Sequence, residues 1–87
     1  MRSVSDLKTK AIVANIRKIR EYRNYTQDYL AAKLRISQNA YSKIELGYSN
    51  ITLSRLIEIA AILEVSLIEI ITAESEGITR SKLSVSN

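Results

Sequence analysis

Polar and apolar residues alternate irregularly within "ISQNAYSKIELG", residues 36–47. Helical side chains one, four and five positions apart share one side, because each residue turns a helix by about 100°. The residues with that spacing are Gln38, Asn39, Ser42 and Lys43. Asn and Gln amides match the N6/N7 edge of adenine, and a Lys ammonium matches the O6/N7 edge of guanine. This side has no acidic residue, so it is either a base-reading surface or an ordinary solvated helix face, which would more often include Glu or several Lys.

A helix that presents these side chains needs a start, an end and an apolar side. Ser37 is placed to cap its first turn and Gly47 to end it, which predicts a short helix over residues 38–46. Tyr41 and Ile44 supply the apolar side. We therefore expect one side of this helix to be held against the domain and the other side to face outward.

A second short helix precedes this one. Thr26 is its candidate N-cap residue, and Asp28 lies in the first turn, where a carboxylate complements the helix dipole. The helix should end near Leu34 and Arg35, with small Ala31 where the two helices cross. Two short helices joined by a tight turn form the helix-turn-helix arrangement.

The rest of the chain also favours helices, because it contains no Pro, only two Gly and few alternating runs. The fold class is therefore all-α. A first helix is expected from near Ser5 or Thr9 to about Arg23, ended by Asn24 in the left-handed conformation. Its buried stripe would consist of Ile12, Ile16 and Ile19.

Two further helices follow residue 52. One starts after Thr52 and is apolar on most sides, which predicts a place in the centre of the fold. The other opens with "SLIE", residues 66–69, a capping-box pattern. Tyr22 and Tyr25 are expected to close the core under the first two helices.

The composition limits what this chain can do. Its 87 residues suffice for one small domain, expected over 9–73, with 1–8 as an arm or the start of the first helix and 74–87 as a polar, mobile tail. It has no Cys and no His, so the usual metal ligands are missing, and no group stands ready to activate a Ser or Tyr nucleophile. We expect no catalysis, metal or cofactor.

The charge is distributed unevenly along the chain. Residues 1–35 hold nine Lys or Arg against three acidic residues, whereas residues 56–79 hold five Glu and no basic residue. This pattern favours a nucleic-acid surface with an acidic far side, although a balanced solvated surface would also fit. No apolar run approaches the ~20 residues that span a bilayer, and "MRSVSDLKTK" lacks the features of an export signal. The expected protein is soluble and cytoplasmic, without a membrane partner.

From Ile16 to Ile71 the sequence resembles the lambda-repressor-like, or Xre, helix-turn-helix family. The stretches that carry the resemblance are "YTQDYLA", "ISQNAYSKIELG" and "ILEVSLIEII". The resemblance implies five helices, of which the second and third form the DNA-binding unit, and sequence-specific binding to double-stranded DNA by a small transcriptional regulator, most simply a repressor. An alternative is a protein-interaction module, such as an antitoxin or anti-repressor partner, that binds a protein through its C-terminal helix.

The resemblance also implies roles for individual residues. Gln38, Asn39 and Lys43 would read bases, and Ser42 would reach a base or a neighbouring phosphate. Gln27 would hold a phosphate and brace the third helix. Residues of the loop after that helix would meet the DNA backbone, mostly through their N–H groups: Gly47, Tyr48, Ser49, Asn50 and Thr52. The remaining candidates for phosphate contact, chosen by charge, are Arg17, Lys18, Arg23, Lys33 and Arg35.

Arg20 and Glu45 match positions that form an ion pair between the first helix and the end of the third in many relatives. Two other positions, Arg35 and Glu64, are usually Gly in the family. If their backbone is left-handed, each costs about 1 kcal/mol, which Arg35 would offset by a phosphate contact. Otherwise the turns relax to a conformation that suits any residue.

The sequence also departs from the family pattern at several surface positions, where it has aromatic or apolar residues. Tyr29 and Tyr48 would be partly buried with their hydroxyls in water, or Tyr48 would pack against the sugar-phosphate edge. The acidic end carries apolar residues that would form the interface of a homodimer. They are Ala61, Leu67, Ile68 and Ile71.

Overall fold

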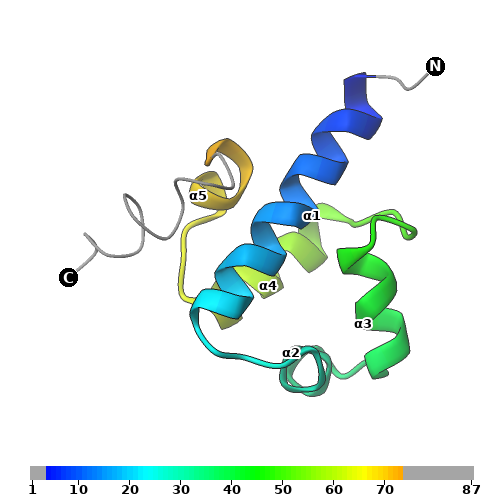
Figure 1. The fold of residues 1–87 in the computed structure, drawn as a ribbon, viewed down its shortest axis with the longest axis vertical. Coiled ribbons are helices and arrows are strands. Elements are labelled where there is room, and N and C mark those ends of the chain that lie inside the picture. Colours follow the sequence, from blue (N-terminus) through cyan, green and yellow to red (C-terminus); the bar gives the residue numbers. More distant parts are fainter. Residues whose placement is uncertain (1–3, 74–87) are drawn as a thin grey trace.

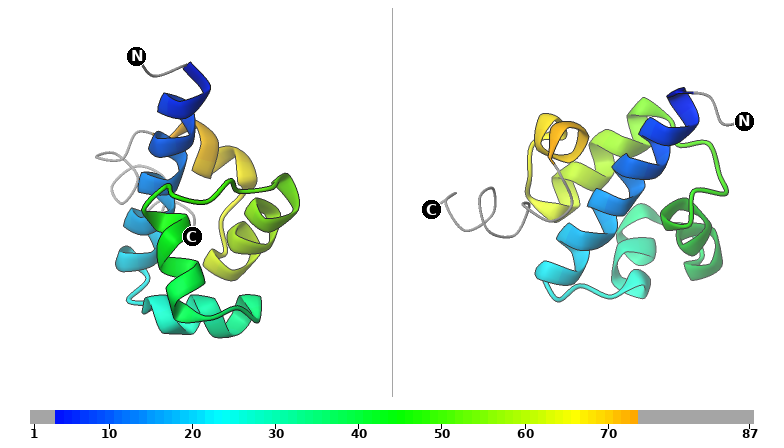
Figure 2. Two further views of the ribbon diagram at one scale, coloured as in Figure 1. Left: turned by 90° about the vertical axis from the view of Figure 1, so that its right-hand side faces the viewer. Right: turned by 45° about the horizontal axis from the view of Figure 1, so that its top comes forward.

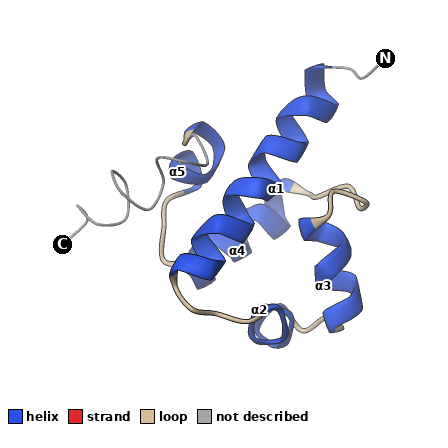
Figure 3. Cartoon of the chain, viewed as in Figure 1, coloured by secondary structure: helices blue, strands red, loops and turns tan. Residues whose placement is uncertain are grey.

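The chain forms five helices and no strand between residues 4 and 73, the part that this computed structural model describes (Figures 1 and 3). The helices are α1 (Val4–Tyr22), α2 (Gln27–Leu34), α3 (Gln38–Glu45), α4 (Leu53–Leu63) and α5 (Leu67–Thr72). The predicted all-α class with five helices is confirmed. The tail expected at 74–87 lies outside the described residues.

Four helices begin where a Ser or Thr hydroxyl accepts a backbone N–H of the first turn, as predicted. The Thr26 hydroxyl accepts from the N–H of Tyr29, and the Ser37 hydroxyl accepts from the N–H of Ala40. At α5 the capping box is complete, because the Glu69 carboxylate also accepts the N–H of Ser66. The N-cap residues of α2 to α5 are Thr26, Ser37, Thr52 and Ser66.

Three non-Gly residues end helices in the left-handed conformation. Asn24 has φ 62°, as expected of a residue type that tolerates this region. Arg35 has φ 61° at the end of α2, and Glu64 has φ 62° at the end of α4. The turns therefore do not relax, and each of these two residues carries a backbone cost of about 1 kcal/mol.

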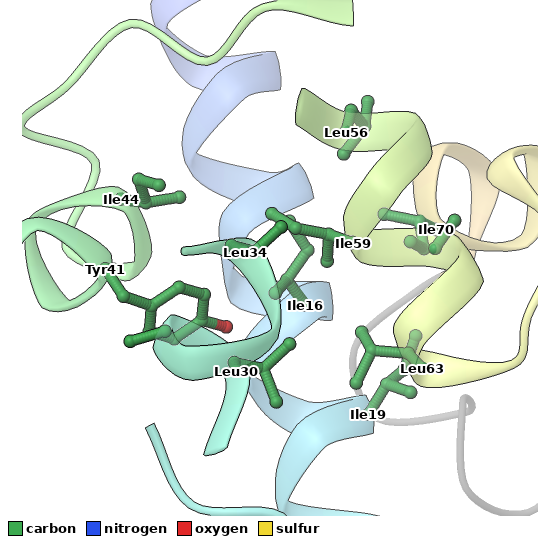
Figure 4. Packing of buried hydrophobic residues seen from close by; sticks show 12 residues of the cluster. Ile16, Ile19, Leu30, Leu34, Tyr41, Ile44, Leu56, Ile59, Leu63 and Ile70 are labelled. Carbon is green, nitrogen blue, oxygen red and sulfur yellow. The ribbon is translucent and has the colours of Figure 1, made fainter. Parts of the chain in front are cut away.

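The core lies where the five helices meet, with α1 in contact with α3, α4 and α5, and α2 in contact with α3 and α4 (Figures 1 and 2). Figure 4 shows the buried side chains that α1, α2, α3, α4 and α5 contribute to one cluster. The largest of those that are fully buried are Tyr41, Ile16, Ile19, Leu30, Ile59, Leu63 and Ile70. The first helix of the helix-turn-helix, α2, packs against both α3 and α4, so α3 is anchored to the core through its neighbour as well as directly.

Helix α1 begins at Val4, one residue before the earlier of the two expected starts, so residues 4–8 belong to the first helix. Two other expectations about the fold are wrong. Tyr22 is 43% exposed and does not close the core, although Tyr25 is half-buried and its ring packs against that of Tyr29, with centroids 4.6 Å apart and the planes tilted by 41°. Tyr48 is 75% exposed rather than partly buried.

Helix α4 is central but not buried on all sides. Its buried residues follow one stripe, Leu56, Ile59, Ala60 and Leu63, which faces α1, α2 and α5. Leu53 and Ile57 are 64% and 51% exposed, because the described part of the chain has no further layer to cover the opposite side of α4. No helix in residues 4–73 has both the length and the apolar character to cross a membrane.

Candidate nucleic-acid interface

Helix α3 separates its side chains into a buried side and an outward side. Tyr41, Ile44 and Glu45 are buried. Gln38, Asn39 and Lys43 are exposed and Ser42 is half-buried, all on the outward side. The first turn of α3 contains no acidic residue, so its N–H groups meet no carboxylate within the helix. The outward side thus presents amides, a hydroxyl and one ammonium.

A buried polar cluster holds the end of α3. The Arg20 guanidinium of α1 makes two bonds to the Glu45 carboxylate, with Nε 2.7 Å from Oε2 and Nη2 3.1 Å from Oε1. The Gln27 amide of α2 donates to Glu45 Oε1 over 3.2 Å, and the Tyr41 hydroxyl donates to Glu45 Oε2. Arg20 Nη1 also donates to the carbonyl of Tyr25 over 2.8 Å. One carboxylate therefore joins α1, α2 and α3.

The polar cluster around Glu45 is buried, and the pKa values of two of its members are raised. The side chains of Arg20 and Glu45 are only 11% and 3% exposed. Burial, together with the bond to Glu45, raises the pKa of the Tyr41 hydroxyl far above its ordinary value. The hydrogen bond to Glu45 raises the pKa of Arg20 despite partial burial. Apolar residues can often replace a buried pair of this kind without loss of stability, so net stability is not the main contribution to expect from it.

Tyr41 shows what sequence reasoning missed at this site. Its ring is buried as expected, but its hydroxyl is the fourth member of the cluster around Glu45. The spacing from 41 to 45 was the available signal, since residues four apart on a helix are neighbours. The Arg20–Glu45 pair, in contrast, joins residues 25 positions apart and was expected only from the family resemblance.

The loop between α3 and α4 follows the end of α3 directly. Gly47 has φ 79°, a conformation that suits glycine, and allows the chain to turn immediately after α3. Tyr48 and Asn50 are exposed, Ser49 is half-buried, and the Thr52 hydroxyl accepts the N–H of Arg55. Figure 2 (left) shows α3 and this loop on the same side of the molecule. Ser49, Asn50 and Thr52 share a shallow hollow with Ile36, Ala40 and Ile44, so the loop lies next to α3 on the side of Ala40.

Gln27 and Arg35 lie at the two ends of α2, the helix before α3. Gln27 is half-buried at the first position of α2, and Arg35 is exposed in the turn that leads to α3. Arg23 is used elsewhere, because its guanidinium donates to the carbonyls of Leu63 and Glu64 at the end of α4. Arg23 therefore links the end of α1 to the end of α4.

The residues predicted to form a homodimer interface lie on the side of the molecule away from α3, where α5 packs against α1 and α4 (Figure 1). Ile68 is 70% exposed and Ile71 is 44% exposed, and Ala61 is exposed on α4. Leu67 is half-buried against the core. The fold separates these residues from α3.

Asn15 is a buried polar residue that the sequence did not indicate. It is 2% exposed, and its amide donates to the carbonyls of Ile70 at 2.7 Å and Ala73 at 2.9 Å. These carbonyls belong to the last turn of α5 and to the residue that follows it, so Asn15 satisfies acceptors that a helix end leaves free.

Among the residues that the structure describes, no group of three His, Cys, Asp or Glu could hold a metal ion.

Comparison with known proteins supports the helix-turn-helix arrangement of α2 and α3. A family model described as helix-turn-helix matches residues 16–70, which run from the second half of α1 into α5 and make up more than half of the chain. No curated protein and no solved structure matched the chain. The first half of α1, residues 4–15, precedes the matched region.

Proposed function

The chain belongs to the lambda-repressor-like (Xre) helix-turn-helix family of DNA-binding regulators, and we propose that it represses transcription by occupying a specific duplex site. The observation that carries the proposal is the outward side of α3. Gln38, Asn39 and Lys43 are exposed together on a helix whose opposite side is held by the core and by Glu45. A helix presented in this way can enter a major groove with its side chains already in register.

The base-reading roles follow from the chemistry of those side chains. In the proposed complex Gln38 and Asn39 bind adenine edges and Lys43 binds a guanine edge. Half-buried Ser42 has a shorter reach, so it bonds to a base or to the phosphate next to it. Each good base contact is worth about 1–3 kcal/mol of discrimination against a wrong base.

Contacts to the DNA backbone would set the position of α3. Gln27 and Arg35 supply them at the two ends of α2, and the exposed ring of Tyr48 packs on the sugar-phosphate edge. The other proposed phosphate contacts come from Gly47, Ser49, Asn50 and Thr52. Such contacts fix the register of the protein but carry no sequence information.

A homodimer would double the site that is read. We propose that Ala61, Ile68 and Ile71, with the accessible part of Leu67, form its interface on the side away from α3. A two-fold dimer would place its two α3 helices about 34 Å apart, one turn of DNA. Light scattering over a concentration series tests this proposal, and a monomer at all concentrations would rule it out.

Selection of bound DNA from a random duplex library tests the reading of bases. Lys43→Ala should remove the preference at one base pair of the selected site, with a loss of about 1–3 kcal/mol for the preferred base. If the selected sequence is unchanged and binding is only uniformly weaker, Lys43 contacts a phosphate and its proposed role is wrong.

The exposed isoleucines of α5 favour a second candidate, a module that binds another protein and whose DNA binding is secondary. A mobility shift on genomic DNA separates the two candidates. A DNA-binding repressor shifts DNA at low salt and loses affinity steeply as salt is added. The absence of any shift at low salt would select the interaction module.

A further inference from the structure

The first half of α1 extends the domain beyond the region that matches the family. Residues 4–15 add about three turns to the helix, and they carry Lys10 toward the loop after α3. We propose that the basic side of α1, formed by Lys10, Arg17 and Lys18, binds the phosphodiester backbone of duplex DNA that flanks the sequence read by α3. This inference rests on the proposed function.

The position of Lys10 beside the loop is the first observation. Lys10 Cγ lies 3.8 Å from the point where a Cβ would stand on Gly47, and a methyl group of Val13 lies 3.9 Å from it. Gly47 opens the loop proposed to meet the DNA backbone. The side of α1 next to Lys10 is therefore continuous with a surface already assigned to phosphates.

The shape of this surface is the second observation. Lys10, Arg17 and Lys18 line an open hollow of about 450 Å³, whose other wall includes Leu46 at the end of α3. From Lys10 to Lys18, α1 rises about 12 Å. Each strand of duplex DNA carries one charge per about 3.4 Å of its axis, so this length faces more than one phosphate. Figure 2 (left) shows the first half of α1, the loop and α3 on one side of the molecule.

The charges of the hollow favour an anion. Two carboxylates also line it, but Glu45 is bound to Arg20 and Glu21 is bound to Arg17. The second pair has exposed partners, so it is weak and Arg17 can exchange Glu21 for a phosphate at little cost. Each of these carboxylates is thus balanced by an arginine. Lys10 and Lys18 add two positive charges on exposed side chains, so positive charge is in excess around the hollow.

The first test measures how salt affects binding to the selected DNA site. Lys10→Gln and Lys18→Gln should each lower the slope of log K against log salt by about 0.9, because each removes one phosphate contact. The order of preference among DNA sequences should not change. The matched control is Lys8→Gln, which removes the same charge from an exposed residue two positions from Lys10, about 200° around α1. Its slope should equal that of the wild-type protein.

Two outcomes of this test would overturn the inference. Equal reductions in all three variants would show an effect of net charge rather than of this surface. Unchanged slopes for Lys10→Gln and Lys18→Gln would show that neither residue meets a phosphate.

The second test shortens the DNA on both sides of the selected site. The wild-type protein should lose affinity until it matches the variant that combines Lys10→Gln and Lys18→Gln, whereas that variant should lose nothing further. A wild-type affinity that does not depend on duplex length would overturn the inference. If the full chain binds no duplex at any salt, the proposed function fails and this inference fails with it. If Lys43→Ala changes base preference while Lys10→Gln and Lys18→Gln keep the wild-type slope, only this inference fails.

Discussion

Helices α3 and α5 are held to α1 by different kinds of polar contact. At α3, Arg20 meets a buried carboxylate that also accepts bonds from Gln27 and Tyr41. At α5, the neutral amide of Asn15 donates to two backbone carbonyls. The first contact is charged and depends on the geometry of four side chains, whereas the second satisfies the end of a helix. The difference agrees with the proposed function, in which the angle of α3 must be set closely for its outward side chains to meet base edges, while α5 needs only to be docked.

The outward sides of α3 and α5 also differ in polarity. α3 presents amides and an ammonium, whereas α5 presents Ile68 and Ile71. Polar side chains at fixed angles suit a partner with a pattern of donors and acceptors, and an exposed apolar patch suits another protein surface. The molecule therefore presents a polar side at α3 and an exposed apolar side at α5.

The largest effect is expected from removing one charge of the cluster at α3. Arg20→Ala leaves the Glu45 carboxylate buried without its cation and should cost about 3–5 kcal/mol of unfolding free energy, measured in urea. The triple variant Arg20→Met, Tyr41→Phe and Glu45→Leu also removes the hydroxyl that bonds to Glu45, so it should recover much of this stability but not specific DNA binding, because apolar residues do not set the angle of α3. Normal base preference in the triple variant would contradict the orienting role.

Asn15→Ala serves as the matched change at α5. It should cost about 1–3 kcal/mol of unfolding free energy, because two backbone carbonyls lose a buried donor. It should leave the selected DNA sequence unchanged. An altered sequence would mean that α5 also influences α3, which would remove the contrast between the two helices.

The next effect is expected from Tyr41→Phe, which keeps the buried ring and removes the bond to Glu45. A hydrogen bond to a charged group is worth about 1.5–3 kcal/mol, so urea unfolding at neutral pH should show a loss of this size.

The same variant should change the dependence of stability on pH. The pKa of Tyr41 is raised on folding, so its contribution is fully present below the unfolded pKa of about 10 and is lost as the pH rises above it. Above pH 10 the unfolded chain binds fewer protons, and Tyr41 should lower stability by about 1.4 kcal/mol per pH unit. Tyr41→Phe should remove this part of the slope in urea titrations between pH 9 and pH 11.5. A slope identical to that of the wild-type protein would show that Tyr41 titrates normally.

The smallest effect compares the two strained turns. Arg35→Gly and Glu64→Gly should each relieve about 1 kcal/mol of left-handed strain, measured as a higher urea midpoint. Only Arg35→Gly should also weaken DNA binding, since Arg35 lies in the turn between α2 and α3. Equal DNA affinity in both variants would show that Arg35 does not contact the DNA backbone.

The sequence was a good guide wherever a structural feature depends on residues three or four positions apart. The caps at Thr26, Ser37, Thr52 and Ser66 lie within one turn of the N–H groups that they accept, and Asn24 ends α1 by its own backbone preference. These local rules placed α2 to α5 to within a residue or two. Helical spacing also indicated which side of α3 faces outward, whereas the partner of Arg20 was expected only from the resemblance to a family.

Only the tertiary structure decided the features that join distant segments. Asn15 meets α5 across 55 residues, and Arg23 reaches the end of α4 across 40, contacts that no local pattern predicts. The exposed stripe of α4 was hidden as well, because Leu53 and Ile57 are as apolar as the residues that α1, α2 and α5 cover. The sequence by itself thus determined the helices and the residue types on each side. The packing of those helices decided which apolar sides are covered, which charges are paired, and that Lys10 stands beside the loop after α3, because each depends on which helices become neighbours in space.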